Sequence, residues 1–252
     1  FCELDRVGHD GGVARGEYLQ TLDVTDVATG WTELAGVRNR AQIYVHAAIR
    51  EIRQRLPFEL LGIDADNGGE FINHNLISYC TQEGITFTRS RPYRKNDNCF
   101  VEEKNWSVVR RFAGYARYDT ERQLEVLNEL YRTVRLYVNF FLPSMKLVEK
   151  IRDGSRVHKR YDRPQTPYQR VMASDEVGED RKATLQATLA TLNPAALHRA
   201  IQRHQARLAR LAHATGTPPP SRSVSGQSVV SRVPSRSVST SSATRSSIQR
   251  PQ

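Results

Sequence analysis

The sequence of 252 residues contains few cysteines and no long apolar run. Cys2, Cys80 and Cys99 are too few and too scattered for a disulfide framework or a zinc site, so we expect a reducing compartment. The longest apolar clusters, such as Phe140-Phe141-Leu142, are far shorter than the roughly 18 residues of a membrane-spanning helix. These absences predict a soluble protein without a membrane partner.

The chain also lacks an initiator methionine and a charged-then-apolar leader, because it starts at Phe1. We therefore expect no signal peptide, and we expect either a fragment or a true start further upstream. The length predicts one or two domains, which is enough to bury a sizeable core.

The net charge of +10 is distributed unevenly. Residues 1–150 carry 20 basic and 21 acidic side chains, residues 151–216 carry 12 and 6, and residues 217–252 carry five arginines and no acid. All the excess positive charge is therefore C-terminal. Such clustering favours a polyanion partner because each neutralised phosphate releases condensed counterions. Basic tails also improve solubility, and charge alone does not choose between DNA, RNA and an anionic membrane.

Hydrophobic periodicity and turn signals divide residues 1–142 into alternating strands and helices. The order predicts an α/β fold with a mixed five-stranded sheet flanked by helices. We expect strands at 1–7, 15–27, 31–37, 58–65 and 85–88, helices at 41–56, 71–83, 98–115 and 121–141, and a loop at 89–97.

Downstream, residues 143–180 indicate a basic linker or a small C-terminal element, and residues 181–216 a helical segment. In the helix after Asn193-Pro194, an apolar stripe runs beside a basic stripe. The basic stripe suits either a solvated helix face or a phosphate backbone, and consists of Arg199, Arg203, Arg207 and Arg210. Residues 217–252 contain 12 serines and few large apolar residues, which predicts a disordered Ser/Arg-rich tail. Such a tail is either a loose nucleic-acid tether or has no specific role.

Three carboxylates differ from the other acids by their surroundings. Asp5 lies in the first expected strand, Asp66 opens an Asp-Asn-Gly-Gly turn after the fourth strand, and Glu102 lies near the start of a helix, 35 residues after Asp66. Two of them, Asp66 and Glu102, have an ordinary structural explanation as well. Asp-Asn-Gly suits a plain turn, and an acid near a helix start is favoured by the helix dipole.

The sequence around these acids resembles the integrase-type DDE transposases of bacterial insertion sequences, which are related to retroviral integrases. The resemblance covers roughly residues 1–170. It is carried by Glu3-Leu4-Asp5, Val24-Thr25-Asp26-x-x-Thr29-Gly30-Trp31, Asp66-Asn67-Gly68-x-Glu70-Phe71, Thr88-Arg89-Ser90-Arg91-Pro92-Tyr93-x-Lys95-Asn96-Asp97-Asn98, Val101-Glu102-x-Lys104-Asn105 and, more weakly, Tyr161-Asp162-x-Pro164-Gln165-Thr166-Pro167-Tyr168.

The resemblance implies a ribonuclease-H-like catalytic core at residues 1–142, with Asp5, Asp66 and Glu102 as the catalytic, metal-binding triad. Chemistry gives an independent reason for three acids. Two Mg²⁺ (or Mn²⁺) ions activate the nucleophile and stabilise the leaving oxygen of a phosphodiester, and Mg²⁺ prefers oxygen ligands. We expect Asp5 to bridge the two ions, with Asp66 and Glu102 each holding one.

Neighbouring acids are weaker candidates for this triad. Asp64 lies on the same side of its strand as Asp66 but lacks the following Asn-Gly, and Glu103 is turned about 100° from Glu102 on a helix. Glu3 and Asp10 lie near Asp5, but the family motif selects Asp5.

Several residues near the triad are candidates for DNA binding. The loop between the fifth strand and the catalytic helix is the densest basic loop of the neutral half, and contains Arg89, Arg91, Tyr93, Arg94 and Lys95. Asn105, one helical turn after Glu102, is placed to hydrogen-bond a metal ligand or a phosphate. For Trp106 we favour a core or hinge role over base stacking, and for His9 a structural hydrogen bond over a catalytic role.

The resemblance implies a transposase or integrase core that cleaves DNA at an element's ends and transfers the strand to target DNA. It also implies a homo-oligomer assembled on DNA in the bacterial cytoplasm, near the nucleoid, and no small-molecule substrate. Two alternatives stay open. One is a truncated, catalytically idle DNA-binding remnant that acts as partner or inhibitor of an intact transposase, and the other is a ribonuclease-H-like nuclease acting on RNA.

Overall fold

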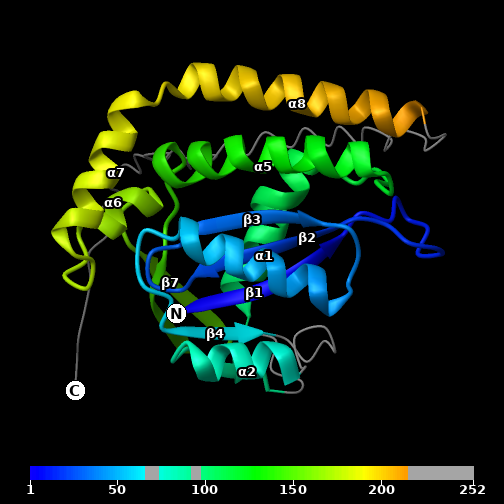
Figure 1. Cartoon of the computed structure of the whole chain (residues 1–252). Coiled ribbons are helices and arrows are strands. Elements are labelled where there is room, and N and C mark those ends of the chain that lie inside the picture. The colour runs from blue at the N-terminus through cyan, green and yellow to red at the C-terminus, as the bar shows by residue number, and fades with distance from the viewer. Residues whose placement is uncertain (66–73, 92–97, 215–252) are drawn as a thin grey trace, which may run out of the picture. The chain divides into compact units, whose positions relative to one another are not determined.

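The sheet contains five strands in the order β3-β2-β1-β4-β5 (Figure 1). Strands β1, β2 and β3 form an antiparallel meander, and β4 and β5 continue the sheet parallel to β1. This confirms the expected mixed five-stranded sheet, and its strand order is ribonuclease-H-like. The strands span Cys2–Gly8 (β1), Gln20–Asp26 (β2), Thr32–Val37 (β3), Gly62–Ala65 (β4) and Thr86–Arg89 (β5).

The structure, a computed structural model, describes residues 1–65, 74–91 and 98–214. Asp66, Tyr93, Arg94 and Lys95 lie outside the described residues, and so does the expected Ser/Arg-rich tail, residues 217–252. Residues Phe1–Pro220 form one structural unit. In the described parts of the chain, no helix is both long enough and apolar enough to cross a membrane.

The second strand is shorter than expected, because β2 begins at Gln20 and not near Arg15. Residues between β1 and β2 form a loop instead. Gly11, Gly12 and Gly16 all have positive φ angles there, a backbone conformation that a strand does not contain. The glycines therefore favour a loop here, although the apolar pattern that follows them predicted a strand.

Successive side chains of strand β1 point to opposite faces of the sheet, and each face is covered by its own layer of helices. Cys2 and Leu4 are fully buried in one apolar cluster, together with Ile49 of helix α1 and Leu76 of helix α2. Glu3 and Asp5 point to the opposite face. Helix α1 spans Gln42–Arg55 and buries residues at helical spacing, and helix α2 spans His74–Gln82.

The opposite face is covered by a helix that changes its hydrogen-bonding pattern. The helix expected at 98–115 occurs as α3 (Cys99–Lys104), a π-helical segment η1 (Asn105–Arg110) and α4 (Arg111–Ala113). Val108 and Phe112 pack there against Leu127 and Leu130 of helix α5 in a second apolar cluster. Helix α5 spans Glu121–Phe141, and Thr120 and Gln123 form a capping box at its start.

The segment expected as a basic linker or small C-terminal element contains a β-hairpin and a short helix. Strands β6 (Leu147–Asp153) and β7 (Arg156–Tyr161) pair antiparallel around a turn at Gly154, whose φ angle is +57°. Helix α6 spans Pro167–Met172.

Two further helices follow, α7 (Glu179–Thr191) and α8 (Pro194–Ala214), and α8 runs along α5 (Figure 1). Ile201 and Leu208 are buried in the cluster with α5. On the basic stripe, Arg207 forms an ion pair with Glu129 of α5, while the other three arginines are exposed: Arg199, Arg203 and Arg210. The helix is therefore held mainly by its apolar stripe.

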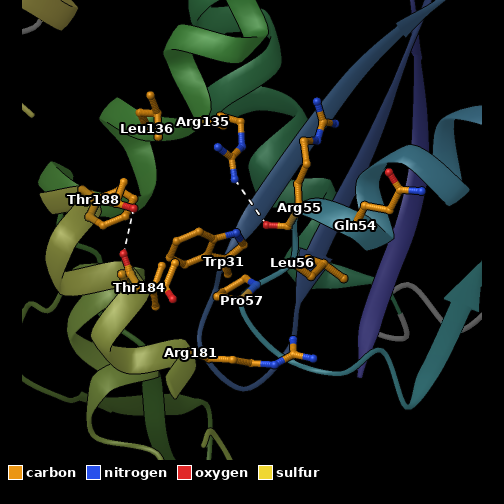
Figure 2. A pocket seen from close by; sticks show the side chains of 12 residues that line it. Trp31, Gln54, Arg55, Leu56, Pro57, Arg135, Leu136, Arg181, Thr184 and Thr188 are labelled. Carbon is orange, nitrogen blue, oxygen red and sulfur yellow. Dashed lines mark hydrogen bonds between the residues drawn. The ribbon is translucent and has the colours of Figure 1, made fainter. Parts of the chain in front are cut away.

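A pocket of about 400 Å³ lies beside Trp31, between the end of α1, α5 and α7 (Figure 2). Next to it, the fully buried Glu33 accepts hydrogen bonds from Trp31 Nε1 at 2.9 Å and from Arg135 Nε and Nη2 at 2.6 Å each. Figure 2 shows Arg135 also reaching the backbone oxygen of Arg55, at 3.4 Å. None of the predicted triad and DNA-binding residues that the structure describes lines this pocket, so we interpret it as part of the packing of the C-terminal helices.

His9 has the structural role that we favoured. Its imidazole is fully buried, and Nε2 lies 2.7 Å from Thr21 Oγ1, which in turn hydrogen-bonds the Tyr131 hydroxyl at 2.5 Å. Burial, with a smaller contribution from the nearby Arg110, lowers the pKa of His9 from 6.5 to about 3. The folded protein therefore holds this histidine neutral.

We predict that acid unfolding depends on His9. The unfolded state binds a proton below pH 6.5 that the folded state refuses until about pH 3, so stability falls as the pH drops through this window. The free energy of unfolding is measured by denaturant titration at several pH values in this range. Plotted against pH, it should rise more steeply in the wild type than in His9→Gln, by up to about 1.4 kcal/mol per pH unit. His158→Gln, which changes an exposed histidine, is the control. Equal slopes in all three proteins would contradict the assignment.

Candidate active site

The carboxyl ends of three parallel strands meet at one edge of the sheet. Leu4 of β1 is in register with Ala65, the last residue of β4, and Ala65 is in register with Arg89, the last residue of β5. Asp5 therefore lies one residue beyond the point where the described part of β4 ends. Arg89 and Arg91 are exposed at the same edge.

Four carboxylates point to one face of this sheet. Glu3 and Asp5 are two residues apart on β1 and thus on the same side. Asp23 of β2 is the register partner of Asp5, and Asp64 of β4 is the register partner of Glu3. Register partners share a face, so the four acids are neighbours. Asp64 accepts a hydrogen bond from Thr88 Oγ1 at 2.7 Å, which occupies one of its oxygens.

Asp23 is an acid that sequence reasoning missed. It is fully buried, and its Oδ1 accepts a hydrogen bond from Thr25 Oγ1 at 3.0 Å. Its Oδ2 is buried and has no hydrogen-bond partner among the described residues. Burial raises the pKa of Asp23 well above 3.8, and the nearby Asp5 raises it further, while Thr25 and Lys104 act in the opposite direction. The environment around Asp5 is therefore strongly electronegative.

Glu3 joins β1 to the helix that carries Glu102. Its Oε2 atom accepts hydrogen bonds from the backbone amides of Phe100 and Val101, both at 2.9 Å. Asn98, which precedes α3, makes no side-chain capping bond, so the Glu3 carboxylate takes that role across 97 residues of sequence. Burial raises the pKa of Glu3, the two amides counteract this, and Asp64 and Glu102 raise it further.

Asn105 contacts the predicted triad directly. Its Nδ2 atom donates a hydrogen bond of 2.6 Å to Oδ2 of Asp5, and the backbone amide of Arg6 donates one of 2.6 Å to Oδ1. Both oxygens of Asp5 are thus oriented by the protein. Of the two roles that we expected for Asn105, the structure displays a hydrogen bond to a candidate metal ligand.

Glu102 is exposed on α3, one turn before Asn105. Its charge contributes, after burial and Asp64, to the raised pKa of Glu3. Within residues 1–65, 74–91 and 98–214, no three His, Cys, Asp or Glu side chains gather closely enough to hold a metal ion. The described residues contain two members of the predicted triad, since Asp66 lies outside them.

A core position for Trp106 was the wrong expectation, because 73% of its side chain is exposed. We placed Trp106 four residues after Glu102 on a regular α-helix. Four residues of an α-helix turn about 400°, so Trp106 lies on the same side of the helix as Glu102, which is exposed as well. The indole lies at the surface beside Asn105.

Comparisons with known proteins give one curated relative and several integrase structures. No family model matches the chain. A protein of Sinorhizobium fredii, named uncharacterized protein y4rM, is 46% identical over 170 residues, which are 68% of this chain and 49% of that protein. The chain thus spans about half the length of this relative.

Among solved structures, the chain is similar to the catalytic core domain of BIV integrase, with 19% identity and a TM-score of 0.45 over 67% of this chain and 90% of that chain. It is also similar to the HTLV-2 integrase catalytic core domain in complex with magnesium, with 14% identity and a TM-score of 0.43 over 57% of this chain and 88% of that chain. The fold assignment itself rests on the strand order and register described above.

We predict that Glu3→Ala loosens the start of helix α3. The variant loses the acceptor of two backbone amides, so the protein should be less stable by about 1–2 kcal/mol. Hydrogen exchange at Phe100 and Val101 should accelerate, whereas Glu3→Gln, which keeps an acceptor oxygen, should retain most of the protection. Glu103→Ala on the same helix is the control. Unchanged exchange in Glu3→Ala would show that another group fixes the helix.

Proposed function

We propose that this chain is an integrase-type DDE transposase core that cleaves DNA strands and transfers them with the help of divalent metal ions. The hydrogen bond between Asp5 and Asn105 is the observation that carries the proposal. It joins the strand that contains the first predicted ligand to the helix that contains the third, at the sheet edge where β4 ends before Asp66. The DDE-like sequence motifs around these positions provide independent support.

The three predicted ligands are acids, the residue type that a magnesium or manganese site needs. The donors are carboxylate oxygens from separate elements, as Mg²⁺ requires, and Asp5 is oriented by Asn105 and by the amide of Arg6. In this proposal Asp5, Asp66 and Glu102 hold two ions. When bound, these ions supply an activated nucleophile and stabilise the leaving oxygen of the phosphodiester. Asp23 is fully buried, and we assign it no ligand role.

The other residues of the site position DNA and the acids. Glu3 fixes helix α3, and Asn105 holds the Asp5 carboxylate in place. Arg89 and Arg91 are exposed at the sheet edge, and together with Tyr93, Arg94 and Lys95 we assign them to the phosphates of a DNA end. The exposed indole of Trp106 is placed to stack on an unpaired base.

The same proposal assigns the protein's partners and location. We propose that it assembles as a homo-oligomer on DNA that comprises element ends and target. We further propose that it acts in the bacterial cytoplasm at the nucleoid.

The decisive variants are Asp5→Asn, Asp66→Asn and Glu102→Gln. Each removes a metal-binding charge, so each should abolish Mg²⁺- or Mn²⁺-dependent cleavage and strand transfer while DNA binding persists. The assay uses labelled duplexes with candidate element ends, and nicked and joined products are separated on gels. Asp64→Asn and Glu103→Gln change neighbouring acids and should retain activity. Cleavage at the wild-type rate in any triad variant refutes the assignment, and a wild type that binds but never cleaves supports an idle remnant.

Asn105→Ala should reduce cleavage by about 10- to 100-fold, because it removes the group that orients a metal ligand. The metal concentration needed for half-maximal activity should rise at the same time. Asn105→Asp should be at least as impaired, since it places a second carboxylate 2.6 Å from Asp5. A titration of Mn²⁺ against the cleavage rate measures both effects. A rate loss without a shift in the metal requirement would assign Asn105 to DNA contact instead.

A further inference from the structure

The hairpin of β6 and β7 is exposed along its whole length. Every residue of Leu147–Asp153 and of Arg156–Tyr161 is exposed, and this includes several large apolar side chains. A two-stranded ribbon on its own is marginally stable in water, so a ribbon with both faces exposed needs an explanation.

The strand register sorts the hairpin side chains into two faces. Lys150 is opposite Lys159, and Arg152 is opposite Val157. Residues two apart on a strand share a face with each other and with their register partners. One side, the cationic face, therefore consists of Leu147, Lys150, Arg152, Val157, Lys159 and Tyr161. The other, the mixed face, consists of Glu149, Ile151, Asp153, Arg156, His158 and Arg160.

The two faces differ in how their charges are balanced. On the mixed face, Arg160 pairs with Glu149 at 2.9 Å, and Asp153 is opposite Arg156. The cationic face contains three cations and no acid. Within the described residues, no carboxylate lies at ion-pair distance from Lys150, Lys159 or Arg152. Like charges directly opposite each other destabilise a strand pair, so Lys150 and Lys159 are better suited to a bound polyanion than to water alone.

The base of the hairpin is firmly attached to the core. Asp162 accepts hydrogen bonds from the amide of Lys146 at 2.6 Å and from Arg170 Nη1 at 2.5 Å. The hydrogen bond from Arg170 is the main reason that the pKa of Asp162 is lowered. Arg170 Nη2 also donates to the carbonyl of Ser144 at 2.9 Å. The ribbon is therefore presented by a fixed base.

This base lies beside the candidate active site. The ammonium of Lys146 donates to the carbonyls of Val27 and Ala28, and it lies 5.4 Å from the centre of the Phe100 ring. Phe100 is two residues before Glu102 on helix α3. A duplex held by the hairpin would thus be close to the predicted catalytic helix.

We propose that the cationic face of the β6–β7 hairpin binds duplex DNA, with the ribbon in the major groove and its three cations on phosphates. This inference rests on the proposed function and adds a DNA-binding surface outside the predicted loop 89–95. The major groove of B-DNA admits a two-stranded ribbon, whereas the major groove of double-stranded RNA is too deep and narrow. Duplex DNA is therefore the partner that fits both the shape and the charge.

The test compares two charge-matched double variants of the full chain. Lys150→Gln with Lys159→Gln removes two cations from the cationic face, and Arg156→Gln with Arg160→Gln removes two from the mixed face. Affinity for a labelled DNA duplex is measured by anisotropy at several salt concentrations. The cationic-face variant should lower the slope of log K against log salt by about two, and the mixed-face variant should leave it unchanged. Both double variants lower the net charge by two, and Arg160→Gln in addition leaves Glu149 without its ion-pair partner.

Thermal unfolding by circular dichroism accompanies the binding assay. Because Lys150 and Lys159 repel each other, the cationic-face variant should unfold at the wild-type temperature or above it. Equal loss of DNA affinity in both double variants overturns the inference. Tighter wild-type binding to double-stranded RNA or to phosphatidylserine vesicles than to duplex DNA overturns it as well.

The same samples separate this inference from the proposed function. If the wild type cleaves DNA but both double variants bind equally well, the hairpin inference fails and the proposed function stands. If binding depends on the cationic face but no metal-dependent cleavage occurs, the hairpin inference stands and the catalytic proposal fails. If the wild type does not bind duplex DNA at all, both are wrong.

Discussion

The candidate site depends on one buried carboxylate, that of Glu3, which accepts two backbone amides at the start of helix α3. The first amides of a helix have no partner within it, and a buried carboxylate without donors is unfavourable. The helix amides therefore gain an acceptor, and the Glu3 carboxylate gains two donors. Because Glu3 belongs to the same strand as Asp5, this interaction fixes the distance between that strand and the helix with Glu102 and Asn105. The hydrogen bond from Asn105 to Asp5 follows from this placement.

The same arrangement explains why acids accumulate on one face of the sheet. Strand β1 alternates, with Cys2 and Leu4 in the apolar core and Glu3 and Asp5 opposite, so a register slip of one residue would bury both acids in that core. Asp23 and Asp64 join them from the neighbouring strands. Burial is the main cause of the raised pKa values of Asp23 and Glu3, and the neighbouring acids raise both further. A protein without a use for this electronegative environment would be more stable with neutral side chains here, since like charges repel in a low-dielectric interior.

The sequence predicted much of the fold because the fold depends on local patterns. The period-2 alternation of β1, the helical spacing of α1 and the capping box at Thr120 are all visible within short windows. The roles of Glu3 and Asp23 are not visible in such windows, because they depend on residues distant in sequence that the strand register and helix α3 bring close. Trp106 was misplaced because a large aromatic side chain favours burial, although its spacing from Glu102 puts it on the exposed side of the helix. The hairpin at Leu147–Tyr161 lacks a buried face, so it has no apolar alternation that a pattern could reveal.

In the proposed function an acidic site acts on DNA, a polyanion, which poses an electrostatic problem that the distribution of charge solves. Residues 1–150 have a net charge of −1, so the part of the chain that contains the candidate site does not by itself attract DNA. The attraction for DNA must therefore come from cations around the candidate site that lie too far from its carboxylates to neutralise them. Exposed charges are screened beyond about 8 Å at physiological salt, so cations act where they meet the phosphates themselves. Arg89 and Arg91 at the sheet edge and the cationic face of the hairpin meet this condition, because they are exposed and attached to elements that adjoin the acids.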